Sequence, residues 1–167
     1  MKSRIARGSA LALLVSLAAT ASPEPDADRF VIRGAGLLDC ANFMEERETE
    51  SRAYLMIGGW IDGYITALNQ YREDTYDITS YESTELLARL IAKHCSDHPD
   101  DRLFTVINSL VARIESDRVR TPTESVPVTV GDRRTHLYAS TVRRIQTRLR
   151  SRGLYEGKID AQYDDQV

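Results

Sequence analysis

The chain has 167 residues, of which 42% are hydrophobic and 28% charged, and 22 Lys and Arg against 25 Asp and Glu leave a formal charge of -3. This length suits one modest domain together with a small second one. The weakly acidic balance gives no reason to expect a nucleic-acid partner. After the first 21 residues, no run of about 20 apolar residues follows that would span a membrane.

The first 21 residues have the three parts of a secretory signal peptide. A basic start over residues 2–7 precedes an apolar stretch, and small residues, Ala19 and Ala21, stand at the -3 and -1 positions. A membrane anchor is the alternative, but a span needs about 20 apolar residues and this run is shorter. We therefore predict cleavage before Ser22 and a periplasmic location.

The charges are unevenly distributed along the chain that would remain after cleavage. Removing three basic residues from 22 leaves 19 against 25 acidic ones, which is a formal charge of -6. Residues 22–116 hold 9 basic and 18 acidic residues, whereas residues 117–167 hold 10 and 7. This asymmetry predicts two modules with different surfaces.

Residues 22–116 are predicted to form a small all-α domain of four helices. Apolar residues recur at spacings of three and four over residues 34–48, 48–71, 84–95 and 100–114, with polar loops between them. Ser83 or Thr84 is expected to cap the third helix, and Pro99 marks the break before the fourth. Complementary apolar stripes on helices joined by short loops predict a bundle.

Two details of these helices are open to a structural test. The second predicted helix contains Gly58, Gly59 and Gly63, each of which costs a helix about 1 kcal/mol relative to alanine. We expect these glycines to let a neighbouring backbone approach closely. In the third predicted helix, we expect Leu90 to be buried together with Leu86, Leu87 and Ile91.

Cys40 and Cys95 are the only cysteines, and export would place them where disulfides persist. A bridge between them would close a loop of about 55 residues, worth about 4 kcal/mol in the chain-entropy model. Zinc ligation and a reactive thiol are alternatives, since His94 and His98 flank Cys95. Structural zinc requires paired ligands at both ends, however, and Cys40 has none nearby. We predict a Cys40–Cys95 disulfide and neither a metal nor another cofactor.

Three motifs of this region occur in a recognisable order. They are GLLDC at residues 36–40, GWIDGY at residues 59–64 and KHC at residues 93–95, followed by Pro99. Together they resemble the small disulfide-bonded periplasmic domains of the HdeA-type acid chaperones and of immunity proteins against type VI amidase toxins. The resemblance implies a helical fold and a protein-binding role. Trp60 and Tyr64 lie on the apolar stripe, so we expect them to pack in the core.

No segment carries a motif of catalytic chemistry. The three histidines, His94, His98 and His136, accompany no Gly-x-Ser-x-Gly, His-Glu-x-x-His or phosphate-binding glycine loop. The glutamates of residues 45–50 are expected to form a solvated face rather than the paired carboxylates of a hydrolase. We therefore predict that the protein is not an enzyme.

Residues 117–139 are predicted to be a linker that contains a small β-hairpin. Pro122 and Pro127 stand among charged residues at its start. Residues 126–130 and 133–138 alternate around Gly131 and Asp132, which is typical of two strands joined by a tight turn. Pro127 would restrict the first strand to an edge.

The last segment, residues 140–167, has the pattern of a short helix followed by a structured turn. Thr141 is expected to cap the helix, with Val142, Ile145 and Leu149 on its buried face, and Gly153 to end it in a left-handed conformation. Val142, Ile145, Gln146 and Leu149, then GLY at residues 153–155, Gly157, Ile159 and Asp160 resemble the peptidoglycan-binding-like domain, a three-helix module of cell-wall hydrolases.

The segment departs from that family in two ways. Ala161 and Asp164 stand where the family has glycines, and the chain ends at Val167, where a third helix would begin. We therefore expect a partial, incomplete helical module that lacks about half of the family's core.

Peptidoglycan is the ligand that this resemblance implies. Sugar hydroxyls, amides and stem-peptide carboxylates suit a groove with aromatic faces, polar side chains and a few positive charges. The candidate ligand-binding residues are Gln146, Tyr155, Asp160 and Tyr163, beside a basic helix face of Arg143, Arg144, Arg148, Arg150 and Arg152. The alternative is that Tyr155 packs in the interior and the arginines are only solvated.

The leading hypothesis is a non-catalytic periplasmic protein that binds or senses peptidoglycan through its C-terminal segment. The alternative is a periplasmic protein-binding module that acts through its helical domain, as an immunity protein against an amidase toxin or as an acid-stress chaperone. The sequence does not identify a protein partner for that role.

Overall fold

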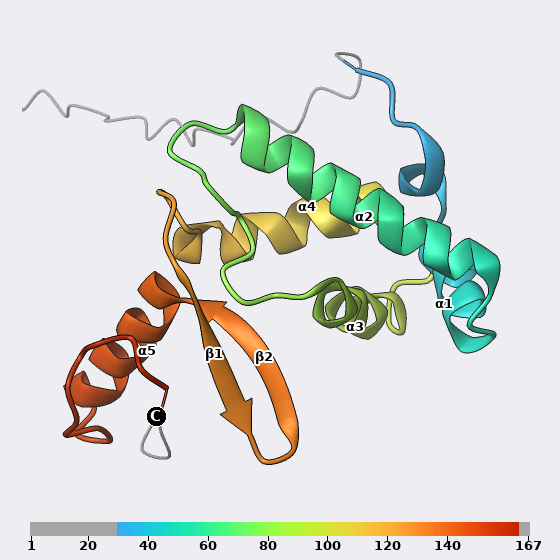
Figure 1. Cartoon of the computed structure of the whole chain (residues 1–167). Coiled ribbons are helices and arrows are strands. Elements are labelled where there is room, and N and C mark those ends of the chain that lie inside the picture. The colour runs from blue at the N-terminus through green and yellow to red at the C-terminus, as the bar shows by residue number, and fades with distance from the viewer. Residues whose placement is uncertain (1–29, 164–167) are drawn as a thin grey trace, which may run out of the picture. The chain divides into compact units, whose positions relative to one another are not determined.

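Helices make up most of the protein, which a computed structural model describes over residues 30–163 (Figure 1). The predicted signal peptide, residues 1–21, lies outside the described residues. The chain divides into two units after residue 31, and the described residues 32–163 lie in the second unit, which is compact. The elements of the second unit are η1 (Gly34–Leu37), α1 (Cys40–Glu48), α2 (Arg52–Tyr71), α3 (Thr84–Cys95), α4 (Leu103–Ile114), η2 (Glu115–Asp117), β1 (Ser125–Val130), β2 (Arg133–Tyr138) and α5 (Ala139–Ser151).

The expected all-α class holds only in a coarse form, because a two-stranded antiparallel sheet accompanies the five α-helices of the described residues. The first predicted helix is in fact two elements. Asp39 is extended and caps α1, and its Oδ1 accepts the Asn42 N–H at 2.8 Å. The Leu38 carbonyl leaves the helical path and accepts the Leu103 N–H at 2.9 Å. A helix cannot continue through residues whose backbone groups are used in this way.

The core of the helical region forms where α2, α3 and α4 face one another. Ile57, Ile61 and Ile65 recur every four residues on α2 and are buried, as the apolar stripe predicted. They pack in one cluster with Leu87, Ile91, Ile107 and Val111. Trp60 and Tyr64 are partly buried against this cluster, and their rings stack at a centroid distance of 5.5 Å.

The expectation for the glycines of α2 is wrong. A Cβ built at Gly59 or at Gly63 meets no atom within 4 Å, and one at Gly58 meets only the Thr84 Cγ2, at 3.8 Å. These positions therefore face open space rather than a closely approaching backbone. By contrast, the close approach occurs at Gly36, where a Cβ would lie 2.5 Å from the Trp60 ring.

Helix α3 begins and ends as the sequence predicted, but one of its leucines is more exposed than expected. Ser83 caps it, with its Oγ accepting the Leu86 N–H at 3.3 Å. Leu87 and Ile91 are buried, whereas Leu90 is 37% exposed, contrary to expectation. The buried face of α3 is made of Leu87, Ala88, Ile91, Ala92 and Cys95. At 3.6 residues per turn, Leu90 lies to one side of the centre of this face, so it is only partly covered.

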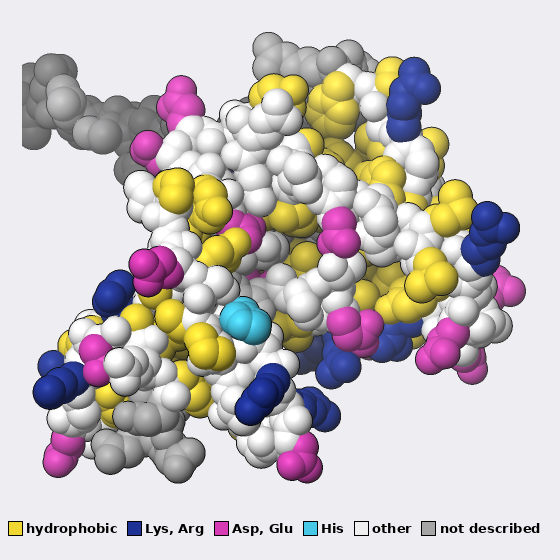
Figure 2. Space-filling model, viewed as in Figure 1, with side chains coloured by type: hydrophobic (Ala, Val, Ile, Leu, Met, Phe, Trp, Pro, Cys, Tyr) yellow, Lys and Arg dark blue, Asp and Glu magenta, His cyan; other side chains and the backbone are white. Residues whose placement is uncertain are grey.

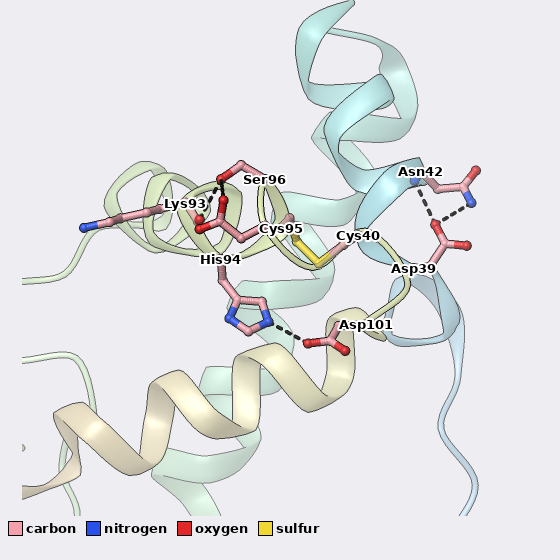
Figure 3. The surroundings of a disulfide bond; sticks show 9 residues. Asp39, Cys40, Asn42, Lys93, His94, Cys95, Ser96 and Asp101 are labelled. Carbon is pink, nitrogen blue, oxygen red and sulfur yellow. Dashed lines mark hydrogen bonds and ion pairs between the residues drawn. A yellow bond between two sulfur atoms is a disulfide. The ribbon is translucent and has the colours of Figure 1, made fainter.

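The predicted disulfide is present and joins the first turn of α1 to the last residue of α3 (Figure 3). Both cysteines are buried, and their Cα atoms are 4.9 Å apart. Beside the bridge, His94 Nε2 lies 2.7 Å from Asp101 Oδ2. This hydrogen bond ties the end of α3 to the loop before α4. The Asp101 carbonyl also accepts the Cys40 N–H at 2.8 Å, so both ends of the bridge are held in place.

The predicted hairpin is also present. Strands β1 and β2 pair in antiparallel register, with Pro127 opposite His136, and Gly131 has a φ of +56° in the turn. The segment before the hairpin is attached to the loop between α2 and α3. The Val119 N–H donates to the Asp77 carbonyl at 2.8 Å, and the Asp77 N–H donates to the Val119 carbonyl at 3.0 Å.

Helix α5 differs from its prediction at the start and agrees with it at the end. It begins at Ala139, so Thr141 lies inside the helix, where its hydroxyl donates to the Ser80 carbonyl at 3.1 Å. The expected Thr141 cap is therefore wrong, because a tertiary acceptor takes the hydroxyl. Gly153 has a φ of +69° just after the helix, as predicted.

Candidate functional site

The four residues expected to bind ligand lie around the loop after α5, and three of them form one hydrogen-bonded cluster. Gln146 is fully buried, and its Nε2 donates to Tyr155 Oη at 3.2 Å, to Asp160 Oδ1 at 3.3 Å and to the Gln162 carbonyl at 2.9 Å. Its Oε1 accepts the Ala161 N–H at 3.1 Å. We call Gln146, Tyr155 and Asp160 the glutamine cluster.

The other members of the glutamine cluster also direct their polar groups toward the protein. Tyr155 is only 4% exposed and donates its hydroxyl to the Lys158 carbonyl at 2.7 Å. The Asp160 Oδ1 accepts the Gln162 N–H at 2.9 Å. This bond, with the weaker one from Gln146, lowers the pKa of Asp160 below its ordinary value. The cluster therefore holds the loop of residues 152–163 against α5.

Tyr163, the fourth candidate, is half-buried and packs against the small apolar cluster of Val128, Ala139, Val142 and Ala161. None of the four candidates presents a ring face or a free amide on an open concave surface among those found in the described residues. Their assignment as peptidoglycan ligands stays a prediction, while their hydrogen bonds and packing account for their presence in the fold.

The basic face expected on α5 is partly used within the protein. The Arg144 guanidinium donates to the Asp117 carbonyl at 2.6 Å and to Ser80 Oγ at 2.9 Å. Arg148 lies 3.0 Å from Asp117 Oδ1, and Arg150 donates to the Gly157 carbonyl. These three arginines attach α5 to neighbouring segments, so they are not simply solvated.

A cleft of about 640 Å³ lies between β2 and the first turns of α3. Arg133, Arg134 and Thr135 line it from the hairpin, and Ser83, Glu85 and Arg89 line it from α3. We call it the arginine cleft. Within residues 30–163, no acidic side chain forms an ion pair with Arg133 or Arg134, which are both exposed.

The charges of the arginine cleft favour an anion. Arg89 Nε already lies 2.9 Å from Glu85 Oε1, so this pair is close to neutral. Arg133 and Arg134 then supply a net positive charge, to which the N-terminal end of α3 adds the positive end of its dipole. A planar guanidinium donates two parallel hydrogen bonds to a carboxylate, so an exposed carboxylate is a suitable ligand.

A second hollow, of about 280 Å³, shares Ser83 and Thr135 with the arginine cleft. It is lined by hydroxyl and aromatic groups, among them Tyr81, His136 and Tyr138, together with the carboxylates of Asp77 and Glu82. The Tyr138 hydroxyl donates to Asp77 Oδ2 at 2.7 Å. Burial and the neighbouring Asp77 raise the pKa of Tyr138 well above its usual range, so this hydroxyl stays protonated. Hydroxyls and ring faces next to a basic cleft suit a ligand with both sugar and carboxylate groups.

The sequence pattern predicted Arg133 and Arg134 only as members of a strand and pointed to no site for them. The adjacent pair directly after the Gly131 turn was the available signal, since neighbouring arginines at a hairpin tip are exposed. The opposite wall could not be found in this way, because Ser83 and Arg89 lie far upstream in the chain. The hydrogen bonds of Asp77 and Ser80 to the C-terminal region bring the two walls together.

Within residues 30–163, no group of three or more His, Cys, Asp or Glu side chains is placed to hold a metal ion. None of the helices in this range combines the length and the apolar character that a bilayer span requires. Comparison with protein-family models, curated proteins and solved structures finds no match to this chain. The two family resemblances in the sequence therefore stay predictions.

Proposed function

We propose that this is a non-catalytic periplasmic protein that binds peptidoglycan through its C-terminal segment. The observation that carries the proposal is the arginine cleft, in which Arg133 and Arg134 have no acidic partner within the described residues. Peptidoglycan stem peptides carry carboxylates, and its glycan strands carry hydroxyls and amides. The cleft and the adjoining hollow near Tyr81 offer guanidinium, hydroxyl and aromatic groups to such a ligand.

Two further observations support the location and the wall-binding role. The signal-peptide pattern of residues 1–21 is typical of exported chains, and the buried Cys40–Cys95 bridge is compatible with an oxidising compartment. The pattern of residues 142–160, which resembles peptidoglycan-binding-like modules, lies in the same C-terminal segment as Arg133 and Arg134. The site proposed here is the arginine cleft rather than the glutamine cluster, because the cluster's polar groups already bond to one another.

The test is co-sedimentation of the oxidised mature protein with purified peptidoglycan sacculi. We expect the protein to pellet, and the Arg133→Ala/Arg134→Ala variant to bind about tenfold or more weakly, because each charge-assisted hydrogen bond is worth about 1.5 to 3 kcal/mol. The Arg143→Ala/Arg152→Ala variant is the matched control. It removes the same charge from exposed positions of α5 and its end, outside the cleft, and should pellet like the original protein.

Absence of pelleting by the original protein, or equal loss in both double variants, would contradict the proposal. The same experiment also tests the proposal that the protein is not an enzyme. We expect no soluble muropeptides or stem peptides to appear in the supernatant over time. Protein-dependent release of such fragments would show that the protein is a hydrolase.

A further inference from the structure

A separate groove, of about 330 Å³, lies between α2 and α3, and peptidoglycan binding as proposed above does not use it. Its surface is mainly apolar, with Ile61 and Ala88 at its base and Leu55 beside them. Leu55 is 73% exposed. Figure 2 shows hydrophobic side chains along the N-terminal half of α2 and between α2 and α3, with acidic side chains next to them. We call this the glycine groove.

Gly58 and Gly59 line the glycine groove and leave it open. Two glycines inside a helix cost about 1 kcal/mol each relative to alanine. Packing within the described residues does not require them, since a Cβ at Gly59 would meet no atom within 4 Å and one at Gly58 would make only an ordinary contact. The missing side chains instead lower the wall of the groove, so that another backbone can come close to α2.

The rim of the glycine groove carries the acidic side chain of Asp62 on the α2 side. On the α3 side, Glu85 is paired with Arg89 and adds little net charge. The Asp62 Oδ1 accepts the Thr84 hydroxyl at 2.6 Å, but no Lys or Arg of the described residues forms an ion pair with Asp62. Residues 22–116 as a whole hold 18 acidic and 9 basic residues. An occupant of complementary charge would carry basic side chains beside its apolar surface.

We propose that the glycine groove binds an amphipathic helix of a partner protein, with an apolar ridge over Gly58 and Gly59 and a Lys or Arg near Asp62. A helix fits because the distance between two packed helices is set by the side chains at the contact, and glycines permit the shortest distances. Helices recognised in this way present apolar residues at i, i+3, i+4 and i+7. The exposed Leu55 would pack against the flank of that ridge.

The experiment uses the oxidised mature protein and two fluorescent peptides of about 18 residues, which is five helical turns. Both peptides have leucines at i, i+3, i+4 and i+7; one has flanking lysines and the other has flanking glutamates. Fluorescence anisotropy measures binding to the original protein, to Gly59→Leu and to Ala67→Leu. Gly59→Leu fills the groove, whereas Ala67→Leu adds a similar apolar group to an exposed position two turns further along α2.

We expect the lysine peptide to bind the original protein and Ala67→Leu alike, and to bind Gly59→Leu at least tenfold more weakly. The thermal midpoint of Gly59→Leu should be equal or higher, since leucine is a better helix former and meets open space. Asp62→Asn should weaken binding of the lysine peptide a few fold. No binding to the original protein, equal binding to Gly59→Leu, or equally tight binding of the glutamate peptide would overturn the proposal. Each result is independent of pelleting with sacculi.

Discussion

The helical region, residues 34–117, and the C-terminal region, residues 119–163, are stabilised by different chemistry. The helical region buries isoleucines and leucines from α2, α3 and α4, with Phe43 from α1, and has a disulfide at one end. In the C-terminal region the apolar cluster has only four fully buried members, and the amide of Gln146 lies buried close by with four hydrogen bonds. A region too small to bury a large apolar core depends more on satisfied polar groups and on its neighbour.

The C-terminal region obtains that support from the loop between α2 and α3. Asp77 accepts the Tyr138 hydroxyl, and the Ser80 carbonyl and hydroxyl accept from Thr141 and Arg144. Removal of residues 117–167 would leave these loop groups without their partners. Point substitutions are therefore better probes of the C-terminal site than truncation.

The largest expected effect tests how far the helical region depends on its covalent link. Replacing both cysteines, Cys40→Ser and Cys95→Ser, should lower the free energy of unfolding by about 4 kcal/mol, because the unfolded chain gains the freedom of a loop of about 55 residues. Urea titration followed by the fluorescence of Trp60, the only tryptophan, measures it. An unchanged midpoint would show that the apolar core alone is sufficient.

The next effect tests whether polar groups are essential in the C-terminal region. Gln146→Met keeps the size of the side chain but leaves the Ala161 N–H without its acceptor, so we expect a loss of about 2 kcal/mol. Ile107→Val in the helical core, at about 1 kcal/mol, is the comparison for a small apolar change. If Gln146→Met is as stable as the original protein, the C-terminal region is held by apolar burial after all.

A smaller effect is expected where the two regions meet. Tyr138→Phe removes the hydroxyl that donates to Asp77 and should cost about 1.5 kcal/mol, the low end for a hydrogen bond to a charged group, because the site is half-buried. Amide hydrogen exchange should also become faster in β1 and β2. Tyr76→Phe is the matched control, since the Tyr76 hydroxyl has no hydrogen bond within residues 30–163 and its ring packs edge-on against Tyr138.

One substitution should stabilise the helical region, by about 1 kcal/mol. Gly63→Ala replaces a glycine inside α2 at a position where a Cβ meets no atom within 4 Å, so the helix gains alanine's higher propensity. The same change at Gly36 should destabilise the protein, because the new Cβ would lie 2.5 Å from the Trp60 ring. A lower thermal midpoint for Gly63→Ala would contradict the open surface described for this face.

The effect of pH compares one carboxylate in each region and should be the smallest. Hydrogen bonds from Asn42 and from Gln162 lower the pKa values of Asp39 and Asp160, respectively, below 3.8. A lowered pKa in the folded state stabilises the protein above the ordinary value, and this contribution is lost as the pH falls through the folded pKa. Thermal midpoints measured from pH 6 to pH 2 should therefore drop below about pH 4. Asp39→Asn and Asp160→Asn should each make that drop shallower, and an identical drop in all three proteins would exclude these two groups as its cause.

Local signals in the sequence were sufficient for most of the elements. The stripe of Ile57, Ile61 and Ile65 predicted α2, Ser83 predicted the start of α3, and the turn at Gly131 predicted the hairpin. The disulfide followed from Cys40 and Cys95 being the only pair. These features depend on residues a few positions apart, or on a pairing without competitors, so the chain itself contains enough information.

Only the tertiary structure decided where the polar side chains are used. Thr141 donates to Ser80 instead of capping α5, and Gln146, expected to face a ligand, lies buried within its own loop. The arginine cleft is lined by both Arg134 of β2 and Ser83 before α3. The face at Gly59 is open because no other described segment packs over it. A helix cap or an apolar stripe is determined by neighbours in the chain, whereas the partner of a hydroxyl, an amide or a guanidinium depends on which distant segments the packing brings together.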